Sequence, residues 1–247
     1  MTMQPTPAIQ KLTHDLDTYF TRGRKLTAFE IKGLEKKVNA SKDKMDFSDY
    51  YVFLGIIAAF RQDAEKVAYN FENALKLTPT DFSIPINYII ALNQIGSYLQ
   101  ALKFGKPLIK TLNNDRLLDE LIASAFFLGR FHEAFELLSQ LTDPEQSRLY
   151  PLIIAAVKIV DLTQLADDDA EQIQQLAFSF LPERKLYFSN TTIEIIDNFI
   201  HYGIYVDLLI AEVAPLNFEL SLRFAEKLDN RRDDVILFEY KSVETLK

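Results

Sequence analysis

The residues that could carry out chemistry in this sequence are few and lie apart from one another. Three successive carboxylates, Asp167–Asp169, offer the oxygen ligands that Ca²⁺ and Mg²⁺ prefer. Three consecutive residues at the start of a helix do not face one point, however, and no glycine-bearing loop follows them. We therefore interpret them as residues that stabilise a helix N-terminus, where the macrodipole favours negative charge.

The histidines and the one serine motif give no better candidate. His14, His132 and His201 are far apart in the sequence, and none belongs to an HExxH pair. His132 follows a glycine at the expected start of a helix, where a solvated or backbone-bonded imidazole is the simplest interpretation. Ser41–Lys44 spells SxxK, but no SDN or KTG motif follows, so we interpret it as a chance match.

Glycine and cysteine usage excludes further classes of site. The seven glycines cannot compose a GxGxxG motif, a Walker loop or a GxSxG elbow. The absence of cysteine from the sequence removes disulfides, Cys-ligated zinc and thiol nucleophiles. The charged run at 231–234 reads as a polar turn. The sequence therefore predicts a protein that is not an enzyme, with no catalytic residues, no cofactor and no metal.

Apolar residues follow a helical period nearly throughout. One stripe consists of Ile9, Leu12, Leu16, Tyr19 and Phe20, and another of Ile31, Leu34 and Val38. Thr27 with Glu30 is typical of a capping box that opens the second of these helices. The segment 235–240 (VILFEY) fits a terminal helix or a strand. We expect an all-α fold.

The turns between these helices recur at a nearly constant interval. Gly96 and Gly129 are 33 residues apart, and the same register 34 residues earlier falls on Gln62. Gly203 lies 74 residues after Gly129, which leaves room for one divergent unit over about 144–180. Each unit is expected to be an αα-hairpin whose seam residue permits a tight turn, as glycine does by reaching positive φ.

Residues 48–81 resemble a tetratricopeptide repeat (TPR). The matches are the first-helix residues Tyr51, Leu54 and Gly55, the second-helix residues Phe71, Ala74 and Pro79, and in the next two units Gly96 with Ala101 and Gly129 with Ala134. The resemblance covers residues 48–146 and implies a TPR-like α-solenoid, a right-handed superhelix of antiparallel helical hairpins. It divides the chain into a basic N-terminal hairpin (1–45), three TPR-like repeats (46–146), and divergent helical repeats with a C-terminal cap (147–247).

The family's geometry implies a concave groove lined by the first helix of each unit. Placed on this chain, the groove contains Val52, Ile56, Phe60, Ile86, Asn87, Ile90, Asn93, Gln94, Arg116, Glu120, Ala123 and Phe127. One TPR subclass clamps C-terminal carboxylates, but its Lys, Asn and Arg positions fall here on Val52, Ile56 and Glu120. Only Asn87 and Arg116 fit, so a clamp is not expected.

Such a groove suits an apolar or amphipathic segment of a partner, whose backbone the amides would bind. The alternative is that the chain's own N-terminal helices or C-terminal tail bury these apolar residues. Both interpretations remain open at this stage.

Charge distinguishes between classes of partner. The net charge of −8 argues against nucleic-acid binding by broad phosphate neutralisation. Residues 1–45 nevertheless carry nine Lys and Arg against five acids, a balance of +4. No apolar signal segment or membrane span is evident, so we expect a cytoplasmic protein without membrane association.

The sequence thus predicts a protein–protein interaction scaffold, chaperone or adaptor that binds a protein or peptide. In outline it is similar to the small acidic TPR chaperones of bacterial secretion systems, which keep apolar translocator proteins soluble. A homodimer is compatible with the sequence, because repeat proteins self-associate through exposed terminal helices. The alternative is a regulator whose basic N-terminal hairpin contacts nucleic acid while the repeats sense a peptide or partner.

Overall fold

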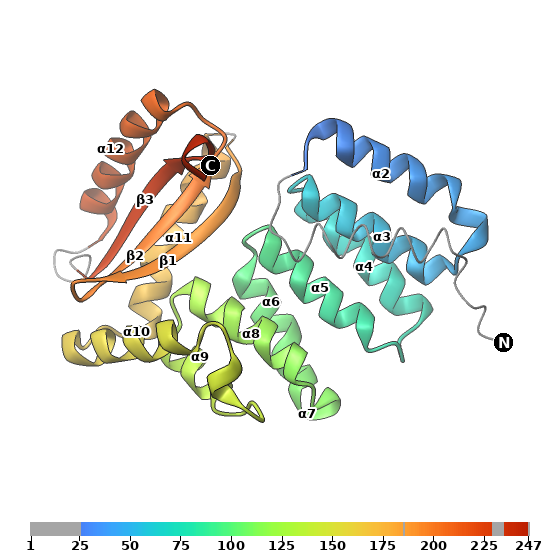
Figure 1. Cartoon of the computed structure of the whole chain (residues 1–247), viewed down its shortest axis with the longest axis horizontal. Coiled ribbons are helices and arrows are strands. Elements are labelled where there is room, and N and C mark those ends of the chain that lie inside the picture. Colours follow the sequence, from blue (N-terminus) through green and yellow to red (C-terminus); the bar gives the residue numbers. More distant parts are fainter. Residues whose placement is uncertain (1–25, 185, 229–234, 247) are drawn as a thin grey trace. The chain divides into compact units, whose positions relative to one another are not determined.

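A computed structural model of the chain describes residues 26–184, 186–228 and 235–246 (Figure 1). These residues are mostly helical, which confirms the expected helical class, but they also form a small three-stranded sheet. The chain divides into two compact units, residues 1–113 and 114–247. The expected helical stripe from Ile9 to Phe20, His14 and the polar turn at 231–234 lie outside the described residues.

The first unit consists of helices that pack on their neighbours in the sequence. α3 packs on both α4 and α5, and α2 packs on α3. The capping box that opens α2 is confirmed: Glu30 N–H donates to Thr27 Oγ1 at 3.2 Å, and Thr27 N–H donates to Glu30 Oε2 at 2.9 Å. The elements are α2 (Ala28–Ala40), η1 (Lys42–Lys44), α3 (Phe47–Phe60), α4 (Ala64–Leu77), α5 (Ser83–Gln94), α6 (Tyr98–Gly105), η2 (Lys106–Leu108) and α7 (Ile109–Leu112).

The second unit begins with helical hairpins and continues into a sheet. Its elements are α8 (Asp115–Leu128), α9 (Phe131–Leu138), η3 (Pro144–Gln146), α10 (Tyr150–Thr163), α11 (Asp167–Glu183), β1 (Phe188–Ile196), β2 (Phe199–Val206), α12 (Ile210–Lys227), β3 (Ile236–Ser242) and η4 (Val243–Leu246).

Four helix–helix turns share one geometry. The seam residues Gln62, Gly96, Gly129 and Gln164 have φ of 57°, 72°, 89° and 56°. In each turn the next residue's N–H donates to the carbonyl five residues earlier, at 2.9–3.0 Å, which is the Schellman pattern. The intervals are 34, 33 and 35 residues. The predicted turns at Gly96 and Gly129 are therefore confirmed. The fourth turn falls within the divergent unit expected over 144–180, but there α10 packs on α9 and β1, and α11 packs on α8, α12 and β3.

The small residue that was expected five positions after the seam lies where paired helices meet. Ala101 and Ala134 are fully buried, and so is Val67 at the same position of the first hairpin. Their helices therefore pack closely against the helix that precedes each turn.

The expectation of helical repeats through residue 247 is wrong from Phe188 onward. β1 and β2 form an antiparallel hairpin whose two-residue turn, Asp197 and Asn198, has φ of 47° and 69°. Positive φ at both positions is the type I′ pattern, which matches the twist of the strands. β3 lies parallel to β2 after the crossover through α12, so the order is β1-β2-β3. The ambiguous 235–240 segment is a strand.

Gly203 is a sheet residue and not a helical turn. It lies opposite Thr192 on β1, and a Cβ at this position would come within 2.6 Å of Thr192 Oγ1. Glycine is required there by close cross-strand approach. The 74-residue interval from Gly129 therefore has no structural counterpart.

The helices of the second unit cover one face of the sheet. Ile204 and Val206 of β2 and Tyr240 of β3 belong to a core with Ala177 of α11 and Leu216 of α12. Figure 1 shows α11 behind the strands and α12 beside β3. Alternate residues turn to the other face, where Leu237 and Glu239 are exposed.

Candidate functional site

The predicted groove residues fall in both units. Those from Val52 to Gln94 lie on α3 and α5 in the first unit, and those from Arg116 to Phe127 lie on α8 in the second.

The apolar part of the predicted groove on α3 and at the start of α5 is not an open surface. Val52, Ile56 and Ile86 are 8%, 9% and 6% exposed and belong to the core of the first unit. The predicted role of these three side chains as groove contacts is therefore not supported, because a ligand reaches a buried side chain only if the core opens. Phe60, at the end of α3, is half-buried.

α5 turns one partly open stripe outward. Most of this helix is buried, while Asn87, Ile90, Asn93 and Gln94 are half-buried. The Gln94 side-chain oxygen is buried and accepts no hydrogen bond from the described residues. Gln62 Nε2 donates to the Gln94 backbone carbonyl at 3.2 Å, which holds this end of α5 beside the first turn. The stripe thus combines one aliphatic side chain with amides.

On α8 the predicted residues also share one stripe. Arg116, Glu120, Ala123 and Phe127 are spaced four, three and four residues apart, which places them on one helix face. Arg116 is exposed and the other three are half-buried, whereas Ala125 is fully buried on the opposite side. The structure therefore brings together the predicted residues within each helix.

The second unit also contains a polar junction that sequence reasoning missed. The Asp167 carboxylate accepts the backbone N–H groups of His132 and Glu133, at 3.1 Å each, and lies 2.9 Å from His132 Nδ1. Asp161 Oδ1 lies 2.9 Å from His132 Nε2. Asp167–Asp169 lie in the first turn of α11, as interpreted from the sequence. In addition, Asp167 caps the N-terminus of α9, a different helix. The imidazole is held between two carboxylates and is not simply solvated.

A second ion pair joins the same helices. Arg130 Nε donates to Glu171 Oε2 at 2.5 Å, and its Nη1 donates to Glu133 Oε2 at 3.0 Å. Glu171 is buried on α11. The third hairpin is therefore tied to the fourth through α9 and α11, and this supports a structural role for the junction.

His132 makes the stability of this junction dependent on pH. Its pKa is raised above the ordinary value, chiefly by the hydrogen bond to Asp161 and also by that to Asp167, while partial burial opposes the shift. A histidine whose folded pKa exceeds its unfolded pKa stabilises the fold below the unfolded value of about 6.5, and this contribution is lost as pH rises through the folded value.

We expect the stability difference between the wild type and His132→Gln to be larger at about pH 6 than at about pH 8. Urea unfolding followed by far-UV circular dichroism at both pH values measures it. Asp161→Asn is the matched control, since it removes one carboxylate and leaves the Asp167 cap of α9 in place. A difference that is independent of pH would contradict the assignment.

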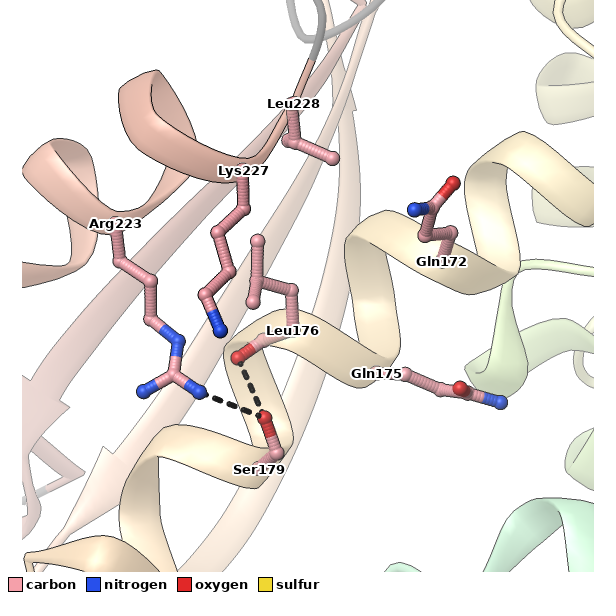
Figure 2. Close-up of a pocket in the computed structure, with 7 residues that line it drawn as sticks. All are labelled: Gln172, Gln175, Leu176, Ser179, Arg223, Lys227 and Leu228. Carbon is pink, nitrogen blue, oxygen red and sulfur yellow. Dashed lines mark hydrogen bonds between the residues drawn. The ribbon is translucent and has the colours of Figure 1, made fainter.

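A hollow with a volume of about 450 Å³ lies between α11 and α12. Figure 2 shows Arg223 and Lys227 of α12 pointing towards Leu176 and Ser179 of α11. Arg223 also forms a two-point ion pair with Glu183, at 2.5 and 2.7 Å. Because Glu183 already binds its guanidinium, Arg223 ties the two helices together, and the hollow is shallow and open.

In comparisons with known proteins, no family model, curated protein or solved structure matches this chain. Within the described ranges, no three histidine or carboxylate side chains are grouped so that they could hold a metal ion. No helix in the same ranges has the length and apolar character that crossing a membrane requires.

Proposed function

We propose that this protein is a non-enzymatic cytoplasmic adaptor or chaperone, built on TPR-like repeats, that binds an apolar or amphipathic segment of a partner protein. The observation that carries the proposal is the recurrence of one turn geometry in four successive helix–helix turns at intervals of 33–35 residues, three of which join helices that pack as hairpins. Stacked hairpins of this kind bury a continuous core and leave extended faces for binding.

Packing inside the first unit supports the repeat assignment. α3 contacts both its hairpin partner α4 and α5, the first helix of the next hairpin. A Cβ on Gly55 would lie 2.6 Å from the ring of buried Phe71, so the first hairpin closes where the family motif has glycine and an aromatic residue. We therefore take α3–α4, α5–α6 and α8–α9 as three TPR-like units and α10–α11 as a divergent fourth.

The binding surface we propose is the partly open stripe of α5. Ile90 supplies apolar area, and fully burying a side chain of this size contributes roughly 1.5–3 kcal/mol. Asn87 is half-buried on the same stripe and carries an amide that can bond an extended backbone. This arrangement suits a peptide segment with an aliphatic anchor better than a charged ligand.

Cross-linking identifies the partner, and a titration then measures its affinity for this protein. A photoreactive residue is placed at position 90 or, as a control, at position 69, in cells of the source organism. The variant at position 90 should cross-link to a protein that the variant at Tyr69 does not capture. Tyr69 is exposed on α4, away from the stripe. The cross-linked protein is then purified for binding measurements.

We expect Ile90→Asp to weaken binding of that purified partner at least tenfold, which is about 1.4 kcal/mol. The reason is that a carboxylate replaces the aliphatic anchor and must lose water on binding. Isothermal titration calorimetry measures the change, with Tyr69→Asp as the control for an equivalent substitution elsewhere. Equal affinities for wild type and Ile90→Asp, with both proteins folded, would exclude the α5 stripe.

Nucleic-acid binding has less support. The basic residues of the N-terminal segment that lie outside the described residues are Lys11, Arg22, Arg24 and Lys25. Among the others, Lys42 Nζ lies over the rings of Phe47 and Tyr50, at 6.0 and 5.3 Å from their centroids. Together with the net charge of −8, this favours a protein partner.

A further inference from the structure

The outer edge of β1 presents a row of backbone groups directed away from the sheet. Ile200 N–H donates to the Val235 carbonyl at 2.8 Å, so even-numbered β2 residues direct their backbone groups to β3. Odd-numbered β2 residues then face β1, where their partners are even-numbered. It follows that Thr191, Ile193 and Ile195 point their N–H and C=O groups outward, and no hydrogen bond to those groups is found within the described ranges.

The opposite edge of the same sheet is closed. Tyr240 directs its backbone outward from β3, where its N–H donates to Asn217 Oδ1 at 2.7 Å and its carbonyl accepts from Asn217 Nδ2 at 3.0 Å. The Asn217 side chain, on α12, therefore takes the place of a neighbouring strand. Proteins block sheet edges in this way against unwanted pairing. In this sheet, a side chain bonds the outward backbone groups of β3 at Tyr240. Helix α10 contacts β1, but no described side chain is found to bond the outward backbone groups of that strand.

The sequence of β1 favours pairing with another strand. From Asn190 to Ile196 it pairs with β2 without irregularity. The strand FSNTTIEII is rich in β-branched residues and contains no proline, lysine or arginine, which are the usual edge-blocking residues. A regular seven-residue stretch is long enough to accept a further strand.

We propose that β1 pairs antiparallel with β1 of a second copy of this chain, joining the two three-stranded sheets into one of six strands. A strand that pairs antiparallel with its own copy obeys twofold symmetry, the commonest arrangement of homodimers. The twofold axis passes through Ile193, because this register alone uses all seven regular residues. Ile193 then faces its own copy, and Thr191 faces Ile195.

Side-chain pairing agrees with this register. Glu194 lies opposite Thr192 of the second copy, so the strand's one charge faces an uncharged residue. A shift that centres the pair on Glu194 places two carboxylates directly opposite each other, which is destabilising. A shift in the other direction, which centres the pair on Thr192, would include the register irregularity between Phe188 and Asn190 in the paired region. Self-complementarity is the reason for choosing a second copy over an unrelated strand.

The first test is the molar mass of the intact chain by light scattering over roughly a hundredfold concentration range. We expect twice the 28.4 kDa chain mass at the upper end. Thr191→Pro removes an outward N–H and leaves the bonds to β2 intact, since proline is tolerated on the open side of an edge strand. It should raise the dimer dissociation constant at least tenfold, whereas Thr191→Val should not. A monomer at all concentrations would overturn the proposal.

The second test uses the absence of cysteine from the sequence. Thr192→Cys and Glu194→Cys proteins are each oxidised alone and as an equimolar mixture. The mixture should form a mixed disulfide dimer, because positions 192 and 194 face each other across the twofold axis at a close, non-hydrogen-bonded pair. Leu237→Cys, exposed on β3, is the control and should form no disulfide-linked dimer under the same conditions.

Cross-linking of Leu237→Cys equal to that of the mixture would overturn the proposed pairing. This inference does not depend on the proposed binding by α5: loss of the dimer leaves the cross-linking result at position 90 unchanged, and the reverse also holds.

Discussion

Replacing Gly129 by valine should destabilise the second unit by about 3–5 kcal/mol. Gly129 has a φ of 89°, a region in which a β-branched residue is strained. A Cβ there would also lie 2.9 Å from the backbone carbon and oxygen of Ala170 on α11. Both effects act on the same turn, and neither can be relieved by rotating a side chain. Urea unfolding by far-UV circular dichroism measures the loss, since the chain contains no tryptophan.

Gln164→Gly is the matched control. Gln164 occupies the equivalent turn position with a φ of 56°, so glycine there removes strain, and we expect stability to be unchanged or raised by up to about 1 kcal/mol. If Gly129→Val were as stable as the wild type, the turn geometry described for the third hairpin would be wrong.

Tyr240→Ala should cost about 3–5 kcal/mol, the range for removing a large buried aromatic side chain. Tyr240 is fully buried, its ring stacks on Phe180 at 6.1 Å between centroids, and its hydroxyl donates to the Ala177 carbonyl at 2.6 Å. Burial also raises its pKa, so the hydroxyl remains a donor at neutral pH. The same unfolding measurement applies.

Tyr240→Phe separates the two contributions. It keeps the ring and removes only the hydrogen bond, so we expect a loss of about 1 kcal/mol. Equal losses for the two variants would mean that the ring contributes nothing to the core between the sheet and α11, contrary to the packing described above.

The helical hairpins were predictable because their signals are local. A seam residue followed five positions later by a small one marks Gly96 and Gly129, and these features depend only on residues within one hairpin. The fourth hairpin lacks a seam glycine. Gln164 adopts the same positive φ, at a cost in free energy that the surrounding helices offset. Because no glycine marks this turn, the repeat interval is its one signal in the sequence.

The sheet was missed for a different reason. β2 reads FIHYGIYV, in which a glycine before aromatic and aliphatic residues imitates the helical seam. The signal for a β-hairpin was the two-residue turn formed by Asp197 and Asn198, which lies between runs of β-branched residues. The pairing of β2 with β3 carries no local signal, because it joins residues on opposite sides of α12.

The polar junction shows how a site can depend on spatial placement that sequence does not reveal. Asp161 and Asp167 stand on either side of the fourth turn, and His132 follows the third. Their convergence requires that consecutive hairpins stack, so each residue alone looked like an ordinary cap or a surface residue. Ile56 lies on the predicted inner face of α3 but is buried. The periodicity of apolar residues predicts the direction in which a side chain points, but not how deeply it is packed.

The parallel pairing of β2 with β3 also bears on the order in which the chain folds. Ile200 and Ile236 are neighbours in the sheet although 36 residues separate them, whereas each helical hairpin closes over a few residues at its turn. Contacts between distant residues slow folding, since loop closure is unfavourable until the contacts it permits have formed. The hairpins of the first unit should therefore refold quickly, and assembly of the sheet should be the slow phase.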